Sequence, residues 1–442
     1  MNVRRAMAAQ ILIVCALVSG ARAETYDLER CIALALETST NVGISTEQLR
    51  TARGGVVRSY AQFMPNLSMS AWAGHSFAGP STGVFVDAQG RPIQPLGFDY
   101  EAYTFGLQSQ MRLFDWGANI NGLNQSQRGA DAAAYELEYT RDFIRAIVIR
   151  EYYDLVRQRR LFKVQEADLE AKTRNLEQVE AFYKIGSRTK ADYLQARVDQ
   201  GNSQLQLLTV QNAEAIAAAR LKSRLNIPQE SVIEVDESID FSPADFDFSR
   251  EVEHMFQHRS DLLAGRERIE AADAGLSVAK KGRYPTLDAS FNYSWNDRTF
   301  PSDGAVFKRD YVWSIGVFFS WNIFDRFQSR SAIQDAKAQY RIAEYNLQQA
   351  KIDAVLDVKQ IMLNLDQARQ RLDLATETVA AAEENNRLAQ ERYRVGAGTI
   401  LETIEASASL TSAQASLIDA RVDYLINRAD LQRATGRTVT SH

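Results

Sequence analysis

A pair of histidines offers the most direct route to metal chemistry, because His254 and His258 lie four residues apart on a predicted helix. At that spacing two imidazoles share one helix face and could bind one metal ion. The glutamate of an HExxH motif is missing, however, and no third ligand is evident in the sequence. Gly396-Ala397-Gly398 also lacks the preceding strand of a phosphate-binding loop. No nucleophile and base pair with one another, so the sequence predicts no metal site, no cofactor and no enzymatic activity.

A pair of acidic residues is the second candidate. Glu402 and Glu405 are three positions apart in a predicted helix, so their carboxylates lie on one helix face. Such a pair is either an electrostatic site or an ordinary solvated helix face. The choice depends on the elements that position these residues.

The first 23 residues have the composition of a secretory signal peptide, with an apolar run at 11–18 that is too short to span a bilayer. The mature chain would keep one cysteine, Cys31, for which we expect a free, buried thiol on a helix. Three of the 51 Lys and Arg residues lie in the signal, against 56 Asp and Glu in the whole chain. The exported protein is therefore acidic, which argues against a nucleic-acid partner.

The chain contains an internal duplication. The stretch YKIGSRTKADYLQA at 183–196 returns as YRVGAGTILETIEA at 393–406, and the offset of 210 needs no gap from 103 to 226. Upstream the offset is 220, and the ten additional residues of the first copy fall in a turn-rich stretch at 78–101. We expect this stretch to be a loop.

Each copy contains a long helical stretch without proline, at about 115–186 and 325–396, which at 1.5 Å per residue gives helices of roughly 105 Å. From Ala336 to Tyr393 apolar residues recur at steps of three and four, which is a heptad seam with one stutter. In the first copy, apolar residues recur at every seventh position: Leu155, Phe162, Leu169, Leu176 and Tyr183. Helices of this length cannot be buried in a compact globule.

Shorter helices are predicted at 188–226 and 399–434, where the chain returns from each long helix, and a further helix is predicted at about 250–282. The frequent alanines allow close approach on more than one helix face. This composition favours a wall of several helices over a two-stranded coiled coil.

Four other segments alternate between apolar and small or polar residues, at about 65–76, 102–113, 285–296 and 311–323. Their lengths suit tilted transmembrane β-strands with aromatic residues near the ends. The alternative is a soluble sheet that buries its apolar face. In a membrane, four strands are too few to close a barrel, whereas three chains would supply twelve strands around an aqueous lumen.

The duplicated strand pair, the LFDWG junction at 113–117, the uninterrupted long helix and the YxxG turns together resemble the TolC family of outer-membrane channel-tunnels. The resemblance implies an α+β membrane protein: a trimeric 12-stranded β-barrel in outer-membrane lipid, with four strands per chain, continued by a long α-helical periplasmic barrel. It also implies two partners, a periplasmic adaptor (membrane fusion) protein and an inner-membrane pump. The function implied is a passive exit duct for tripartite efflux or type I secretion. The alternative is a soluble periplasmic coiled-coil scaffold or adaptor.

The resemblance places both YxxG turns at the periplasmic mouth of the tunnel. Gly186 and Gly396 would supply the positive φ that ends each long helix. Glu402 and Glu405 match the acidic gate positions of the family, so a trimer would carry two rings of three carboxylates that favour cations.

The family also closes its mouth by links between neighbouring hairpins. Tyr393 and Asp192 match the positions of a hydrogen bond between a phenol and a carboxylate. A second link is missing because Gly398 and Ala191 replace an arginine and a hydroxyl residue. Arg188 stands at the equivalent place in the first repeat, and our hypothesis is that it pairs with Glu402 or another acid.

The predicted organisation is a signal peptide at 1–23, a first repeat at 24–226, an equatorial collar segment at 227–248, a second repeat at 249–436 and a C-terminal tail at 437–442.

Overall fold

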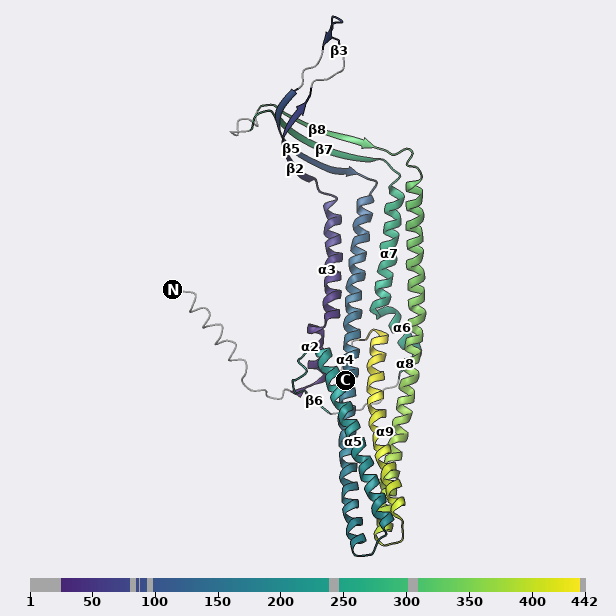
Figure 1. Cartoon of the computed structure of the whole chain (residues 1–442). Helices are drawn as coiled ribbons and strands as arrows, with labels where there is room; N and C mark the ends of the chain where they lie inside the picture. Colours follow the sequence, from purple (N-terminus) through teal and green to yellow (C-terminus); the bar gives the residue numbers. More distant parts are fainter. Residues whose placement is uncertain are drawn as a thin grey trace, which may run out of the picture. The chain divides into compact units, whose positions relative to one another are not determined.

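The computed structural model of the chain describes residues 25–79, 85–86, 88–93, 98–237, 246–300 and 309–437 (Figure 1). The predicted signal peptide, residues 238–245 of the predicted collar and residues 438–442 of the predicted tail lie outside the described residues. The chain divides into two compact units. The helical unit comprises the residues up to Glu47, Tyr135–Leu263 and the residues from Gln348 onward, and the sheet unit comprises Gln48–Ala134 and Ala264–Leu347.

The internal duplication is visible in the helix boundaries. In the first repeat the helices are α2 Leu28–Thr38, α3 Thr40–Ala61, α4 Ala118–Lys184 and α5 Lys190–Leu225. In the second repeat they are α6 Phe248–His258, α7 Ser260–Lys281, α8 Gln328–Arg394 and α9 Ile400–Thr435. The first two of each set differ by 220 positions and the last two by 210, so the two copies fold alike up to their ends.

The sheet unit contains one four-stranded antiparallel sheet in the order β2-β5-β7-β8. Its strands are β2 Asn66–Ala78, β5 Phe98–Phe114, β7 Thr286–Asp297 and β8 Tyr311–Ser320. Within the stretch predicted as a loop, β3 Phe85–Val86 pairs with β4 Pro92–Ile93, and β5 begins earlier than predicted. In the helical unit, β1 Thr25–Tyr26 pairs in parallel with β6 Glu234–Val235 of the predicted collar.

One face of the sheet is apolar and exposed. On β8 the side chain of Ile315 is 73% exposed, and the same face carries other exposed apolar side chains: Leu67, Met69, Trp313, Val317 and Phe319. This exposure contradicts the alternative of a soluble sheet with a buried apolar face. Among the described residues, β2 and β8 each pair with a strand on one side only. The sheet therefore presents two open edges.

The junction between strand and long helix uses the same cap in both repeats. Asp115 accepts hydrogen bonds from the Gly117 N–H (3.0 Å) and the Asn119 N–H (2.9 Å), and Asp325 accepts one from the Ser329 N–H (2.7 Å). The two residues after each aspartate have positive φ, which is unfavourable for the side-chain-bearing ones. The long helices consequently begin three residues later than the sequence predicts.

The heptad seam of the second repeat is confirmed by the buried positions of α8: Leu347, Ala354, Val358, Ile361, Leu365, Ala368, Leu372, Ala375, Ala382, Ala389 and Tyr393. The strict seven-residue seam of the first repeat is confirmed only in part, because Leu176 packs against the buried cluster near the turns but the end of the seam is exposed. Leu155 is buried, but Tyr183 is 38% exposed, and the buried positions of α4 include the polar residues Gln165 and Asp168.

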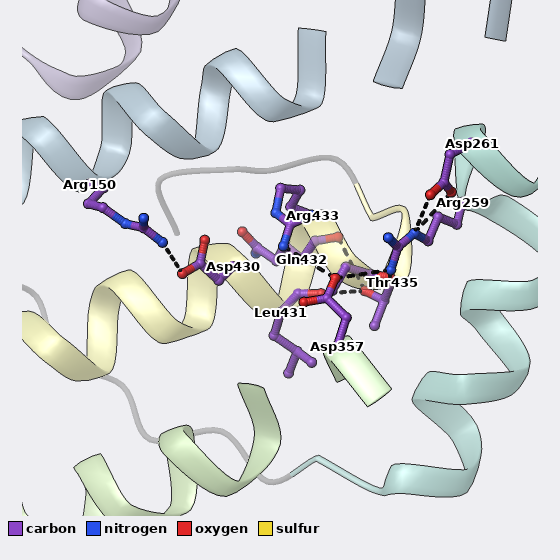
Figure 2. Close-up of polar contacts among 10 residues, drawn as sticks. Arg150, Arg259, Asp261, Asp357, Asp430, Leu431, Gln432, Arg433 and Thr435 are labelled. Atoms are coloured by element: carbon purple, nitrogen blue, oxygen red, sulfur yellow. Dashed lines mark hydrogen bonds and ion pairs between the residues drawn. The ribbon is translucent and has the colours of Figure 1, made fainter. Parts of the chain in front are cut away.

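The single helix predicted at 250–282 is interrupted at Arg259, where α6 ends and α7 begins. Figure 2 shows the Arg259 guanidinium between Asp261 of α7 and Asp357 of α8. It also donates to the Ala434 carbonyl near the end of α9 (3.3 Å). A cation at this helix C-terminus satisfies a carbonyl that has no partner within the helix. The break thus frees Arg259 to hold the end of α9, and the equivalent position Ser39 separates α2 from α3.

Cys31 lies on α2, is fully buried and forms no disulfide with any described residue, as expected. Because it is a core residue, burial raises the pKa of its thiol to about 12.

Among the described residues, no helix has both the length and the apolar character required to cross a membrane.

Candidate functional site

The two YxxG turns end the long helices in the same way. The Gly186 N–H donates to the Tyr183 carbonyl (3.0 Å) and the Ser187 N–H to the Phe182 carbonyl (2.8 Å). The equivalent bonds at Gly396 measure 3.1 and 2.9 Å. This pattern is the Schellman motif, whose reversal requires a residue in the left-handed region. Both glycines have a φ of 76°.

We expect Gly186→Ala and Gly396→Ala each to lower the free energy of unfolding by about 1 kcal/mol, because a side chain disfavours the left-handed region. Added Cβ atoms at these positions would contact nothing within 4 Å, so backbone strain is the only cost. Gly201→Ala is the matched control, since Gly201 lies inside α5 in equally open space. Denaturant unfolding in detergent should show Gly201→Ala to be stabilising, and equal stability of all three variants would contradict the role of the turns.

Four helices of the helical unit pack together next to the turns. Their buried cluster contains one residue from each helix: Val179 of α4, Ala196 of α5, Tyr393 of α8 and Ile400 of α9. Figure 1 shows the two hairpins, α4 with α5 and α8 with α9, that these residues join. Residues of both repeats therefore meet at one place, and the predicted gate residues surround it.

Arg188 lies against Tyr393 and not against an acid. Its guanidinium carbon is 4.1 Å from the centroid of the Tyr393 ring, and its Nη2 donates to the Tyr393 carbonyl (3.1 Å). The hypothesis that Arg188 pairs with Glu402 is wrong within the chain. The cation and the aromatic ring attract each other directly, and the contact joins the first turn to the second long helix.

Asp192 serves mainly as a helix cap. Its carboxylate accepts from the Thr189 N–H (3.1 Å), while the Thr189 hydroxyl accepts from the Asp192 N–H (3.2 Å). This reciprocal pair is a capping box at the start of α5.

The Tyr393 hydroxyl is buried and has no hydrogen-bond partner among the described residues of this chain. Burial raises the pKa of the phenol, so the group remains a neutral donor. The predicted bond between Tyr393 and Asp192 is therefore absent within one chain, and the phenol is left with an unused donor.

Glu402 stands at the position equivalent to Asp192 but behaves differently. Its backbone N–H is capped by the Thr399 hydroxyl (3.2 Å), and its carboxylate lies 3.5 Å from the Arg392 Nη1. A Cβ at Gly398 would lie 3.2 Å from the Glu402 carboxylate and 3.1 Å from the Arg392 Cβ, so this turn has little room for a side chain there. Glu405, one turn further along α9, is exposed. The Glu402 carboxylate therefore lies near a cation, whereas the Glu405 carboxylate is exposed to solvent.

Sequence reasoning missed Arg392 and the buried polar residues of α4. Arg392 is one residue before Tyr393, and its role depends on the tight turn that brings it back toward Glu402. The polar residues could have been found from the repeat itself. Shifting the confirmed seam positions Ala375 and Ala382 by 210 identifies Gln165 and Lys172 as inward-facing.

Comparison with known sequences defines the class of protein. The sequence model of the outer membrane efflux protein family matches residues 31–226 and 252–437, which is most of both repeats. The chain belongs to this family, and it is an outer membrane efflux protein.

Individual relatives agree. The chain is 25% identical over 394 residues to protein CyaE of Bordetella pertussis, covering 88% of this chain and 78% of that one. It is 24% identical over 326 residues to outer membrane protein TolC of Vibrio cholerae, covering 71% and 72%. Among solved structures, outer membrane protein VceC of Vibrio cholerae superposes with a TM-score of 0.80 at 20% identity, over 93% of this chain and 97% of VceC. The TolC-like channel-tunnel fold and the outer-membrane localisation are thus confirmed, and the soluble scaffold alternative finds no support.

Proposed function

We propose that three copies of this chain form a passive exit duct, in which twelve strands close a β-barrel in the outer membrane and the helices continue as a periplasmic tunnel. The observation that supports this proposal most strongly is the sheet itself. Its apolar face is exposed and its edges, β2 and β8, are open among the described residues. Open edges in hydrocarbon leave backbone groups unpaired, at several kcal/mol each. Neighbouring copies remove that cost by pairing β8 of one chain with β2 of the next.

The two hairpin turns form the gate in this proposal. Glu405 is exposed and Glu402 lies on the same helix face, so a trimer brings six carboxylates to the narrow end of the tunnel. Fixed negative charges at a constriction attract cations and repel anions. Arg188 and Tyr393 hold the first turn against the second long helix.

The duct depends on other proteins for energy, because the sequence contains no motif for nucleotide hydrolysis. The partners in this proposal are a periplasmic adaptor protein and an inner-membrane pump. The system is either a tripartite efflux pump or a type I secretion machine, and the pump that co-purifies with the protein identifies the cargo.

Reconstitution in planar lipid bilayers tests the proposed function. We expect small, cation-preferring conductance steps, which are blocked when a trivalent cation is added on the side that holds the helical hairpins. The orientation is set by adding protein from one side and is checked by protease access to the 186–190 turn. A protein that fractionates with the outer membrane but forms no conducting species would contradict the duct.

A further inference from the structure

A buried carboxylate lies about four turns of α4 before the first hairpin turn. The side chain of Asp168 is only 3% exposed. Its Oδ2 accepts from the Ser203 hydroxyl (2.6 Å) and the Gln165 side-chain amide (3.2 Å), and its Oδ1 accepts from the Thr411 hydroxyl (2.9 Å). Lys172 Nζ lies 3.2 Å from the same carboxylate. One aspartate thus has three hydrogen-bond donors and a neighbouring cation.

These partners come from three helices. Ser203 belongs to α5, and Lys172 of α4 also pairs with Asp199 of α5 (3.2 Å), so the first hairpin is held together on one side of Asp168. Thr411 belongs to α9 and therefore to the hairpin of the second repeat. The carboxylate is a direct polar connection between the two hairpins.

The second repeat lacks the polar residues that form this network in the first repeat. The positions equivalent to Asp168, Gln165, Lys172 and Ser203 are occupied by small or less polar residues: Thr378, Ala375, Ala382 and Ala413. Around three of them lies a hollow of about 390 Å³. Since α8 and α9 form a hairpin of the same length as α4 and α5, the hairpin fold does not require the network. Its presence in the first repeat alone points to the connection with α9.

The packing between the network and the turns is incomplete. A cavity of about 390 Å³ is lined by residues of α4, α5, α8 and α9, among them Lys172, Asp199, Tyr393, Thr403 and Ser407. Tyr393, whose buried hydroxyl has no hydrogen-bond partner among the described residues, is one of the lining residues. Between the polar anchor and the buried cluster at the turns, α9 thus borders a hollow. Residues that line this hollow can move with little loss of packing.

From this arrangement we propose that Asp168 is a positioning residue of the gate: it holds α9 against α4 through Thr411, and α9 leaves α4 at this bond when the duct opens. The physical basis is the cost of a buried carboxylate, which is low only while each oxygen has a donor. Removing the Thr411 donor leaves Oδ1 unsatisfied, so the arrangement in which α9 lies against α4 loses stability relative to one in which water reaches Asp168. The role of this bond in gating rests on the exit-duct function proposed above. The bond between Asp168 and Thr411 can itself be tested without measuring transport.

The test uses Thr411→Val, which keeps the shape of the side chain and removes the hydroxyl. Thr376→Val is the matched control. Among the described residues, the Thr376 hydroxyl has one acceptor, the Leu372 carbonyl of its own helix (2.8 Å), whereas the Thr411 hydroxyl shares its single proton between Asp168 (2.9 Å) and the Ser407 carbonyl (3.1 Å). Amide hydrogen exchange of residues 403–415 is measured on the full protein in detergent. We expect exchange about tenfold faster in Thr411→Val than in the wild type, and no change in Thr376→Val.

Asp168→Asn provides the second arm, since it keeps the size of the side chain and removes the charge. If Asp168 and Thr411 act through one bond, the double variant should exchange no faster than the faster single variant. Equal exchange in Thr411→Val and Thr376→Val, or additive effects of the two changes, would overturn the proposal. Single-channel recording then tests the duct function and the gating role of Asp168 separately. A wild type that does not conduct rejects the duct, whereas conducting channels with unchanged open time in Thr411→Val reject the role of Asp168 in gating.

Discussion

Replacing Glu402 and Glu405 together by glutamine should abolish most of the cation preference of the channel and weaken block by a trivalent cation on the order of 100-fold. A trimer loses six negative charges at its constriction, and interactions with a trivalent ion are strong where water is scarce. Glutamine preserves the side-chain size and is a favourable residue near a helix N-terminus, so α9 should still form. Reversal potentials in a salt gradient and block titrations measure both effects.

The two single glutamine variants should differ in their cation preference. Glu405 is exposed, whereas Glu402 lies 3.5 Å from Arg392, so Glu405→Gln should reduce cation preference more than Glu402→Gln. Arg392→Gln should increase the preference, because it frees Glu402. Glu253→Gln serves as a control, since it removes a carboxylate from α6, which contacts the opposite end of α9. Unchanged selectivity in the double glutamine variant would show that these carboxylates do not line the pore.

The second large effect concerns the apolar face of the sheet. We expect Ile315→Arg to prevent stable insertion into the outer membrane, because an arginine on the lipid face near the bilayer midplane costs about 2–4 kcal/mol per chain. Three chains would carry three such residues in one barrel. The readout is the fraction of protein recovered in the outer membrane as a species whose electrophoretic mobility changes on heating.

Ser314→Arg is the control for this experiment. Ser314 is the preceding residue on β8 and points to the opposite face, which faces the lumen in the proposed barrel. This variant should insert and assemble normally while changing conductance. If both variants insert equally well, the exposed apolar face is not the lipid surface.

The duplicated pattern was sufficient to predict the strands, the two long helices and their return helices, because each depends on a periodicity that is continuous in the sequence. The helix break at Arg259 could not be read in this way. Nothing in the sequence around Arg259 interrupts a helix by itself, and the break is stabilised by Asp357 and the end of α9, which are distant in sequence. Tertiary contacts of this kind override local propensity.

The candidate gate was likewise predictable from the sequence only in part. The positive φ of Gly186 and Gly396 followed from residue type and position, since glycine adopts that region without strain. The partners of Arg188 and Asp192 did not follow, because each has a nearby alternative to the predicted acid or phenol. Asp192 is three residues from the Thr189 N–H, and a local cap forms at little entropic cost.

The polar anchor at Asp168 was missed for a physical reason. A seam built on apolar residues does not include a carboxylate, and burial of Asp168 is tolerable only because three helices supply donors. The signal lay in comparing the repeats, since the counterpart of Asp168 in the second copy, Thr378, lies three residues after the seam residue Ala375 and four before the seam residue Ala382.

Closure of the sheet by neighbouring copies is the claim on which the proposed duct and its gate depend. Native mass spectrometry of the full protein, released from detergent micelles, measures it most directly. We expect a species with the mass of three chains that remains intact until the detergent or temperature unfolds the sheet. A stable single chain that keeps its sheet without detergent would contradict it.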